Sequence, residues 1–101
     1  MEVRFQCSAV REYQLTRQYY SRIDPNLADR FRSAVDAVVA RILADPNSLP
    51  EAGSGFRRIR VKNFPYVIFF KVLDGETIGI YTVAHTSRRP GYWRRRRIEE
   101  E

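Results

Sequence analysis

Several residue types that build common functional sites are scarce in this 101-residue chain. It has one cysteine, Cys7, and one histidine, His85. A single cysteine cannot form an internal disulfide, and a Cys/His zinc cage needs more ligands than these two side chains supply. We therefore predict a protein that holds no metal ion and no cofactor.

Long apolar runs are also lacking. The longest segment without a charged residue spans Thr77 to Ser87, eleven residues, whereas a membrane-spanning helix needs about 20 apolar residues. Charged residues interrupt the first dozen positions, so they predict no signal-peptide core. We expect a cytoplasmic protein with no membrane partner.

The size and composition predict one folded domain. Hydrophobic residues make up 44% of the chain, which excludes wholesale disorder because a disordered chain combines low hydrophobicity with high net charge. A length near 100 residues supports one modest core. We expect a single domain over residues 1–101, ending in a basic tail at about 88–101.

Positive charge is concentrated in the second half of the chain. Residues 1–55 carry seven bases and seven acids, whereas residues 56–98 carry eleven bases and two acids. Sixteen of the eighteen bases are arginine, whose planar fork suits phosphate or carboxylate. This imbalance favours a surface that faces an anionic partner over one that merely keeps the protein soluble.

The first half of the chain predicts one strand and two helices. Residues 2–7 alternate as a half-buried strand does, with Cys7 on its apolar face as a buried residue. Ser8 is a plausible cap for a first helix. Asp24 followed by Pro25 predicts the start of a second helix, which the Asp45-Pro46 pair ends. Its apolar positions recur every three or four residues, at Ala28, Phe31, Val35, Val38 and Ile42.

The second half predicts three strands. Residues 56–62 place Ile59 and Val61 on one face and Arg58, Arg60 and Lys62 on the other. The apolar run at residues 66–73 is typical of a central strand, and Asp74-Gly75 predicts a hairpin to a last strand at residues 77–84.

These elements together resemble the RelE/ParE superfamily of toxins from bacterial toxin–antitoxin modules. The resemblance covers about residues 2 to 96, and its order and spacing carry it. The matching segments are Tyr19-Tyr20, the helix from Leu27 to Asp45, Phe56-Arg57-Arg58, Phe64-Pro65-Tyr66 and the His85-to-Trp93 tail.

The resemblance implies an α+β fold of order β-α-α-β-β-β. In it, a helical hairpin packs on one face of an antiparallel sheet, so that the other face and the edge of the C-terminal strand are available to partners. It also implies a cognate antitoxin as a partner, and the basic surface predicts that the covering antitoxin segment is acidic.

One arm of the superfamily, similar to RelE, cuts messenger RNA on the ribosome without a metal. Such cleavage needs a base, an acid and cations for the extra phosphorane charge. Resemblance to this arm implies catalytic roles for Arg60, Lys62, His85, Arg88 and Tyr92. Its third-strand arginine, however, corresponds here to Tyr66 or Val67, and neither residue is a cation.

The other arm is similar to ParE and inhibits DNA gyrase through a binding surface without cutting RNA. The apolar third strand and the His/Arg/Pro/Trp tail match this arm better, so we predict a non-enzymatic toxin. The predicted target- or antitoxin-binding residues are Arg57, Arg58, Arg60, Lys62, Arg88, Arg89, Tyr92, Trp93 and Arg96.

Alternative roles stay open for several of these residues. The ribosome-dependent RNA endonuclease is the main alternative function, and a non-toxic nucleic-acid-binding domain is the weaker one. His85 is more often a hydrogen-bonded structural residue than an acid or base. Trp93 either stacks on a ligand or closes the core, and Arg94 to Arg97 form either a binding tail or a solvated terminus.

Overall fold

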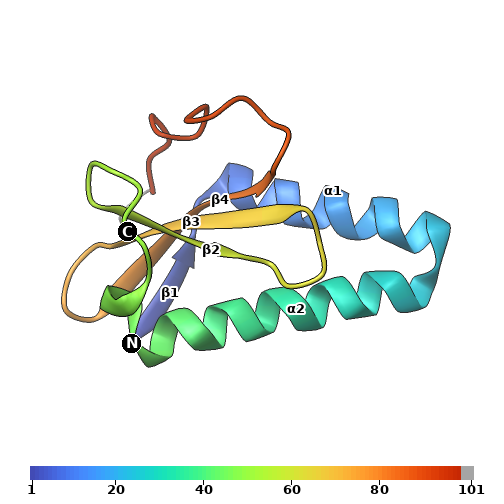
Figure 1. Ribbon diagram of the computed structural model, residues 1–101, viewed down its shortest axis with the longest axis horizontal. Helices are drawn as coiled ribbons and strands as arrows, with labels where there is room; N and C mark the ends of the chain where they lie inside the picture. The colour runs from blue at the N-terminus through green and yellow to red at the C-terminus, as the bar shows by residue number, and fades with distance from the viewer. Residues whose placement is uncertain (99–101) are drawn as a thin grey trace.

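The computed structural model describes residues 1–98 and orders the elements as strand, two helices and three strands (Figure 1). A short 3-10 turn, η1, follows the second helix. The bounds are β1 Glu2–Phe5, α1 Cys7–Ile23, α2 Pro25–Ala44, η1 Pro46–Ser48, β2 Phe56–Arg60, β3 Tyr66–Val72 and β4 Thr77–His85.

Helix α1 begins earlier than the sequence pattern indicated. Gln6 is buried, and its side-chain oxygen accepts hydrogen bonds from the backbone N–H groups of Ser8 and Ala9, at 2.8 and 3.2 Å. These bonds satisfy two of the free donors at a helix start, so Gln6 and not Ser8 is the N-cap. Cys7 is consequently the first helical residue and is exposed, so the prediction of a buried strand cysteine is wrong.

The predicted signals for α2 are confirmed. The Asp24 carboxylate accepts a hydrogen bond of 2.9 Å from the backbone N–H of Asn26, and Pro25 occupies the first helical position. Both features favour helix initiation because the first-turn N–H groups lack partners within the helix. The helix ends at Ala44, one residue before the Asp45-Pro46 pair.

The sheet is mixed, so the prediction of an antiparallel sheet is wrong. The strand order is β1-β4-β3-β2, and β1 pairs with β4 in parallel while the other pairs are antiparallel. The reason is the direction in which each strand runs. The turns after β2 and β3 each reverse the chain, so β4 runs the same way as β2. The helical hairpin lies between β1 and β2 and leaves those two strands in the same direction, so β1 can join β4 only in parallel.

This topology also corrects the expected location of the free edge. Strand β4 lies between β1 and β3, so the sheet edges are β1 and β2. The C-terminal strand is therefore a central strand, and its edge is not available to a partner along the stretch that β1 covers.

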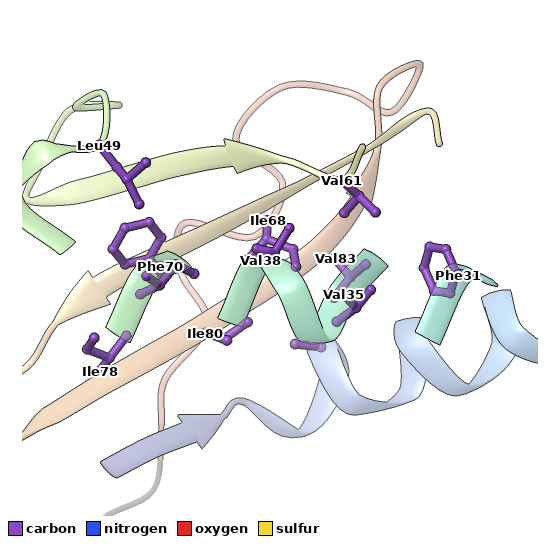
Figure 2. Packing of buried hydrophobic residues seen from close by; sticks show 12 residues of the cluster. Phe31, Val35, Val38, Leu49, Val61, Ile68, Phe70, Ile78, Ile80 and Val83 are labelled. Carbon is purple, nitrogen blue, oxygen red and sulfur yellow. The ribbon is translucent and has the colours of Figure 1, made fainter. Parts of the chain in front are cut away.

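The main core lies between the helical hairpin and one face of the sheet (Figure 2). From α2, Phe31, Val35, Val38 and Ile42 are all at most 5% exposed. They pack against strand residues that face the helices, chiefly Ile68, Phe70, Ile78, Ile80 and Val83. The predicted register of α2 is thus confirmed. Within residues 1–98, no helix is long and apolar enough to cross a membrane.

Candidate functional site

A cleft of about 340 Å³ lies between the sheet and the C-terminal tail, residues 86–98. We call it the tail cleft. Its floor includes Val67, Phe69 and Ala84, which point away from the helices, and its walls come from β2 and the tail. Six of the predicted site residues line it together, namely Arg58, His85, Arg88, Arg89, Tyr92 and Trp93.

Trp93 closes a second, smaller core on the face of the sheet opposite the helices. Its side chain is 2% exposed and stacks on Phe69, with ring centroids 4.3 Å apart, while its edge contact with Phe56 is 4.7 Å. Tyr81 completes this cluster. This face was expected to be open, but the tail covers part of it. Trp93 is therefore a packing residue at the base of the tail cleft.

A bulge in β4 directs two neighbouring side chains toward the tail. Thr82 pairs with Phe69, but the next residue of β3, Phe70, pairs with Ile80, so Tyr81 is an extra residue in β4. A bulge of this kind breaks the alternation of side chains. As a result Tyr81 joins the cluster of Phe56 and Trp93, and the Thr82 hydroxyl reaches the Tyr92 hydroxyl at 3.1 Å.

Glu12 of α1 anchors the tail and was not among the predicted site residues. Its carboxylate accepts hydrogen bonds from both terminal nitrogens of the Arg96 guanidinium, at 2.8 and 3.1 Å, and from the Tyr92 hydroxyl at 2.7 Å. It accepts two further bonds from β4, from the Thr82 hydroxyl at 2.9 Å and the Val83 N–H at 3.1 Å. One carboxylate thus links α1, β4 and the tail.

The Glu12–Arg96 pair occupies the place that a longer β1 would fill. Strand β1 ends at Phe5, opposite Ile80, while β4 continues to His85. Beyond that point the Val83 N–H donates to Glu12, and the Tyr81 carbonyl accepts from Arg96 at 3.1 Å. The ion pair thereby satisfies backbone groups that would otherwise lack partners at a buried strand edge.

Hydrogen bonding and burial determine which protonation states of Glu12 and Tyr92 are favoured. Burial alone would raise the pKa of Glu12, but the hydrogen bonds from Arg96, Tyr92, Thr82 and Val83 outweigh burial and lower that pKa below its ordinary value. Burial raises the pKa of the Tyr92 phenol, and the neighbouring Glu12 carboxylate raises it further. The anion at Glu12 and the neutral phenol at Tyr92 are therefore the favoured forms near neutral pH.

His85 lies at the rim of the tail cleft with one ring nitrogen occupied. Its Nδ1 accepts the Ser87 backbone N–H at 3.0 Å and lies 2.7 Å from the Ser87 hydroxyl, and its ring meets Tyr66 edge-on. Because Nδ1 accepts a backbone proton donor, the neutral ring carries its hydrogen on Nε2. The remaining nitrogen is then a donor.

The other predicted residues lie outside the tail cleft. Arg57 donates to the Leu49 carbonyl at 2.7 Å and pairs with Glu51, and Arg96 is held by Glu12. Lys62 and Arg60 line a separate groove of about 630 Å³ beside α2, which we call the α2 groove. The three bases predicted on one strand face are thus divided, because β2 ends at Arg60 and the turn through Asn63, at φ +69°, redirects the chain.

The chemistry that the tail cleft can perform follows from its side chains. Its cations are arginines, which stay protonated at any physiological pH and cannot act as bases. The Tyr92 hydroxyl already bonds to Glu12, and within residues 1–98 no three His, Cys, Asp or Glu side chains gather as metal ligands would. The arrangement is suited to binding an anionic group.

Comparisons with known proteins assign this architecture. A solved structure described as "Chromosomal ParDE TA system from P. aeruginosa" has the same fold, with a TM-score of 0.71 and 18% sequence identity over 84% of this chain and 95% of that chain. This similarity shows that the two chains share a fold.

The family follows from the sequence itself. Residues 3–90 match the family described as ParE toxin of type II toxin-antitoxin system, parDE. The chain belongs to this family and is a ParE-like toxin. No curated protein sequence matches the chain.

Proposed function

We propose that this toxin stops growth by binding a protein target, such as DNA gyrase, and that it does not cut RNA. The observation that carries the proposal is the position and bonding of the candidate proton-transfer groups. Tyr92 is bonded to Glu12, His85 Nδ1 accepts the Ser87 N–H, and Lys62 lines the α2 groove instead. A proton-transfer mechanism needs a base within hydrogen-bond reach of the reacting hydroxyl.

We further propose that a cognate antitoxin neutralises the toxin by covering its basic surface with an acidic segment. Arg58 and Arg88 line the tail cleft, and Arg60 lines the α2 groove on the neighbouring side of β2. A segment lying across these arginines would exclude the target. Such charge-assisted contacts depend on ionic strength, so we expect toxin–antitoxin affinity to fall with added salt and on Arg60→Ala.

The test of the proposed function is the order of events after induction in cells. Plasmid supercoiling and message abundance are followed in parallel for the native chain, Lys62→Ala and Arg88→Ala. We expect supercoiling to change first, Lys62→Ala to stay toxic, and Arg88→Ala to lose part of its toxicity. Messages that fall first, together with a complete loss of toxicity in Lys62→Ala, would establish the nuclease instead.

A further inference from the structure

We propose that the tail cleft binds an acidic segment of the target protein, in which an apolar side chain lies between two carboxylates. This inference rests on the proposed function, since it names the part of a protein target that the toxin recognises. It follows from three features: the positions of the arginines, the apolar floor between them, and the occupied faces of the aromatic rings.

The arginines flank the floor from two sides. Arg58 projects from β2, whereas Arg88 and Arg89 follow β4, and β3 lies between these two strands. Neighbouring strands are about 4.8 Å apart, so β2 and β4 are separated by about 10 Å, and Arg88 and Arg89 lie just beyond the end of β4. Among residues 1–98, no acidic side chain lines the tail cleft, so we expect a ligand to supply the carboxylates.

The floor between the arginines is apolar. Val67 of β3 and Ala84 of β4 are paired neighbours that face the tail cleft, and Phe69 continues the same face. In an extended peptide, side chains two residues apart lie on one side about 7 Å apart. A carboxylate, an apolar residue and a second carboxylate at alternate positions of such a peptide therefore lie on one side, where the carboxylates reach both arginine groups and the apolar side chain reaches the floor.

The aromatic rings favour a peptide over a nucleic acid. Single-stranded nucleic acids bind by stacking bases on free aromatic faces. Here the Arg88 guanidinium lies 4.0 Å from the Tyr92 ring centroid and that of Arg96 lies 5.1 Å from it. Phe69 stacks on Trp93, and the Arg94 guanidinium lies 4.8 Å from the centroid of the Trp93 ring. These contacts leave little ring surface for a base.

The position of Arg88 is also set before any ligand arrives. Arg88 lies against Tyr92, and the Tyr92 hydroxyl is held by Glu12 at 2.7 Å. A cation that is already in place loses less conformational freedom on binding. This favours recognition by Arg88 over a general attraction to any acidic molecule.

The experiment measures binding of the intact chain to a fluorescein-labelled ten-residue peptide that contains two Asp-Ser-Leu-Ser-Glu units. A second peptide with Asn-Ser-Leu-Ser-Gln units and a ten-nucleotide uridylate RNA are measured beside it. The test variant is Arg88→Gln/Arg89→Gln. Its charge-matched control, Arg30→Gln/Arg95→Gln, changes two exposed arginines outside the tail cleft. Circular dichroism checks that each variant is folded, and Arg58→Gln replaces the test variant if it is not.

We expect the acidic peptide to bind at least tenfold more tightly than the amide peptide. Its affinity should fall at least tenfold in the test variant and less than threefold in the control. Equal losses in both variants would overturn the inference, because net charge alone would then explain binding. Tighter binding of the RNA that is lost in the test variant would overturn it in favour of a nucleic-acid site.

Purified DNA gyrase, measured with the same variants, separates this inference from the proposed function. Gyrase binding that is unchanged in Arg88→Gln/Arg89→Gln would overturn the inference and leave the proposed function standing. If the native chain binds the acidic peptide as expected but does not bind gyrase, the gyrase target fails and the acidic specificity of the tail cleft is supported.

Discussion

Removing the Glu12 carboxylate is the perturbation whose effect the structure defines best. In Glu12→Ala, Thr82 and Tyr92 still bond to each other, and Arg96 still donates to the Tyr81 carbonyl. The Val83 N–H and the Arg96 charge lose their partner. Glu12 and Arg96 are only 17% and 18% exposed, so water does not fully replace the lost contacts.

The expected loss of stability follows from these two groups. A buried donor left without a partner costs about 1–3 kcal/mol, and breaking a buried ion pair from one side costs about 3–5 kcal/mol. Because this pair is partly exposed, we take the lower end of the ion-pair range and expect Glu12→Ala to lower the free energy of unfolding by about 3 kcal/mol. Glu12→Gln keeps an acceptor and should lose less, about 1.5 kcal/mol.

Urea denaturation measures this effect, with Trp93 as the probe. Trp93 is the only tryptophan of the chain and is buried beneath the tail, so its fluorescence reports both tail release and global unfolding. For m near 1.3 kcal/mol/M, a loss of about 3 kcal/mol lowers the midpoint by about 2 M. Asp36→Asn, which removes the exposed 3.9 Å pair with Arg32, is the matched control and should change stability by less than about 0.5 kcal/mol.

The pH dependence of stability tests the contribution of the ionised Glu12 carboxylate. The pKa of Glu12 is lowered from an ordinary value of 4.5, so the folded state binds its proton less tightly than the unfolded state does. This contribution to stability is present above pH 4.5 and is lost as the pH falls through the lowered pKa. The stability difference between the native chain and Glu12→Gln should therefore shrink below pH 4.5. A difference that is constant from pH 7 to pH 3, or a Glu12→Ala midpoint equal to that of Asp36→Asn, would refute this reasoning.

Three further substitutions test other parts of the account. Val38→Asp places an unpaired charge at a core position that is 5% exposed and should unfold the protein, as circular dichroism would report; a folded, toxic Val38→Asp protein would contradict the register of α2. Gly79→Val should lower stability by about 1–2 kcal/mol in thermal denaturation, because a Cβ at Gly79 collides with the Ile98 side chain of the tail; an unchanged melting temperature would show that the tail does not dock there. Trp93→Ala should cost about 3 kcal/mol or more in the same assay, because it opens a cavity beneath the tail, and a loss below 1 kcal/mol would place Trp93 outside the packed core.

Local sequence signals predicted the elements well but did not predict how the strands pair. The caps and spacing of α2 gave its bounds and its buried face because those signals act within one helix. The partner of β1 depends on the direction in which the chain returns after two helices and two hairpins. Alternation within residues 2–7 contains no such information, and the mixed sheet was therefore missed.

The candidate site was likewise predicted only in part from the sequence. Arginines and aromatics in the tail indicated the tail cleft because their chemistry is visible in the sequence. Glu12 was missed because its partners lie 70 to 84 positions away along the chain. One signal was available: Glu12 lies on the helix stripe that includes Ala9 and Thr16, both of which are buried, and a charged residue on a buried stripe requires a partner. The acidic residues at 99–101, which would neutralise the tail arginines if these form a solvated terminus, lie outside the described residues.

The central claim, that this toxin acts by binding a protein, is tested most directly with purified components. DNA gyrase is assayed for supercoiling, and ribosomes on a defined message are assayed for RNA cleavage, each with the native chain and with Lys62→Ala. The account predicts that the native chain and Lys62→Ala inhibit supercoiling equally and that neither cuts the message. Cleavage of ribosome-bound message by the native chain, abolished in Lys62→Ala, with supercoiling unaffected, would contradict it.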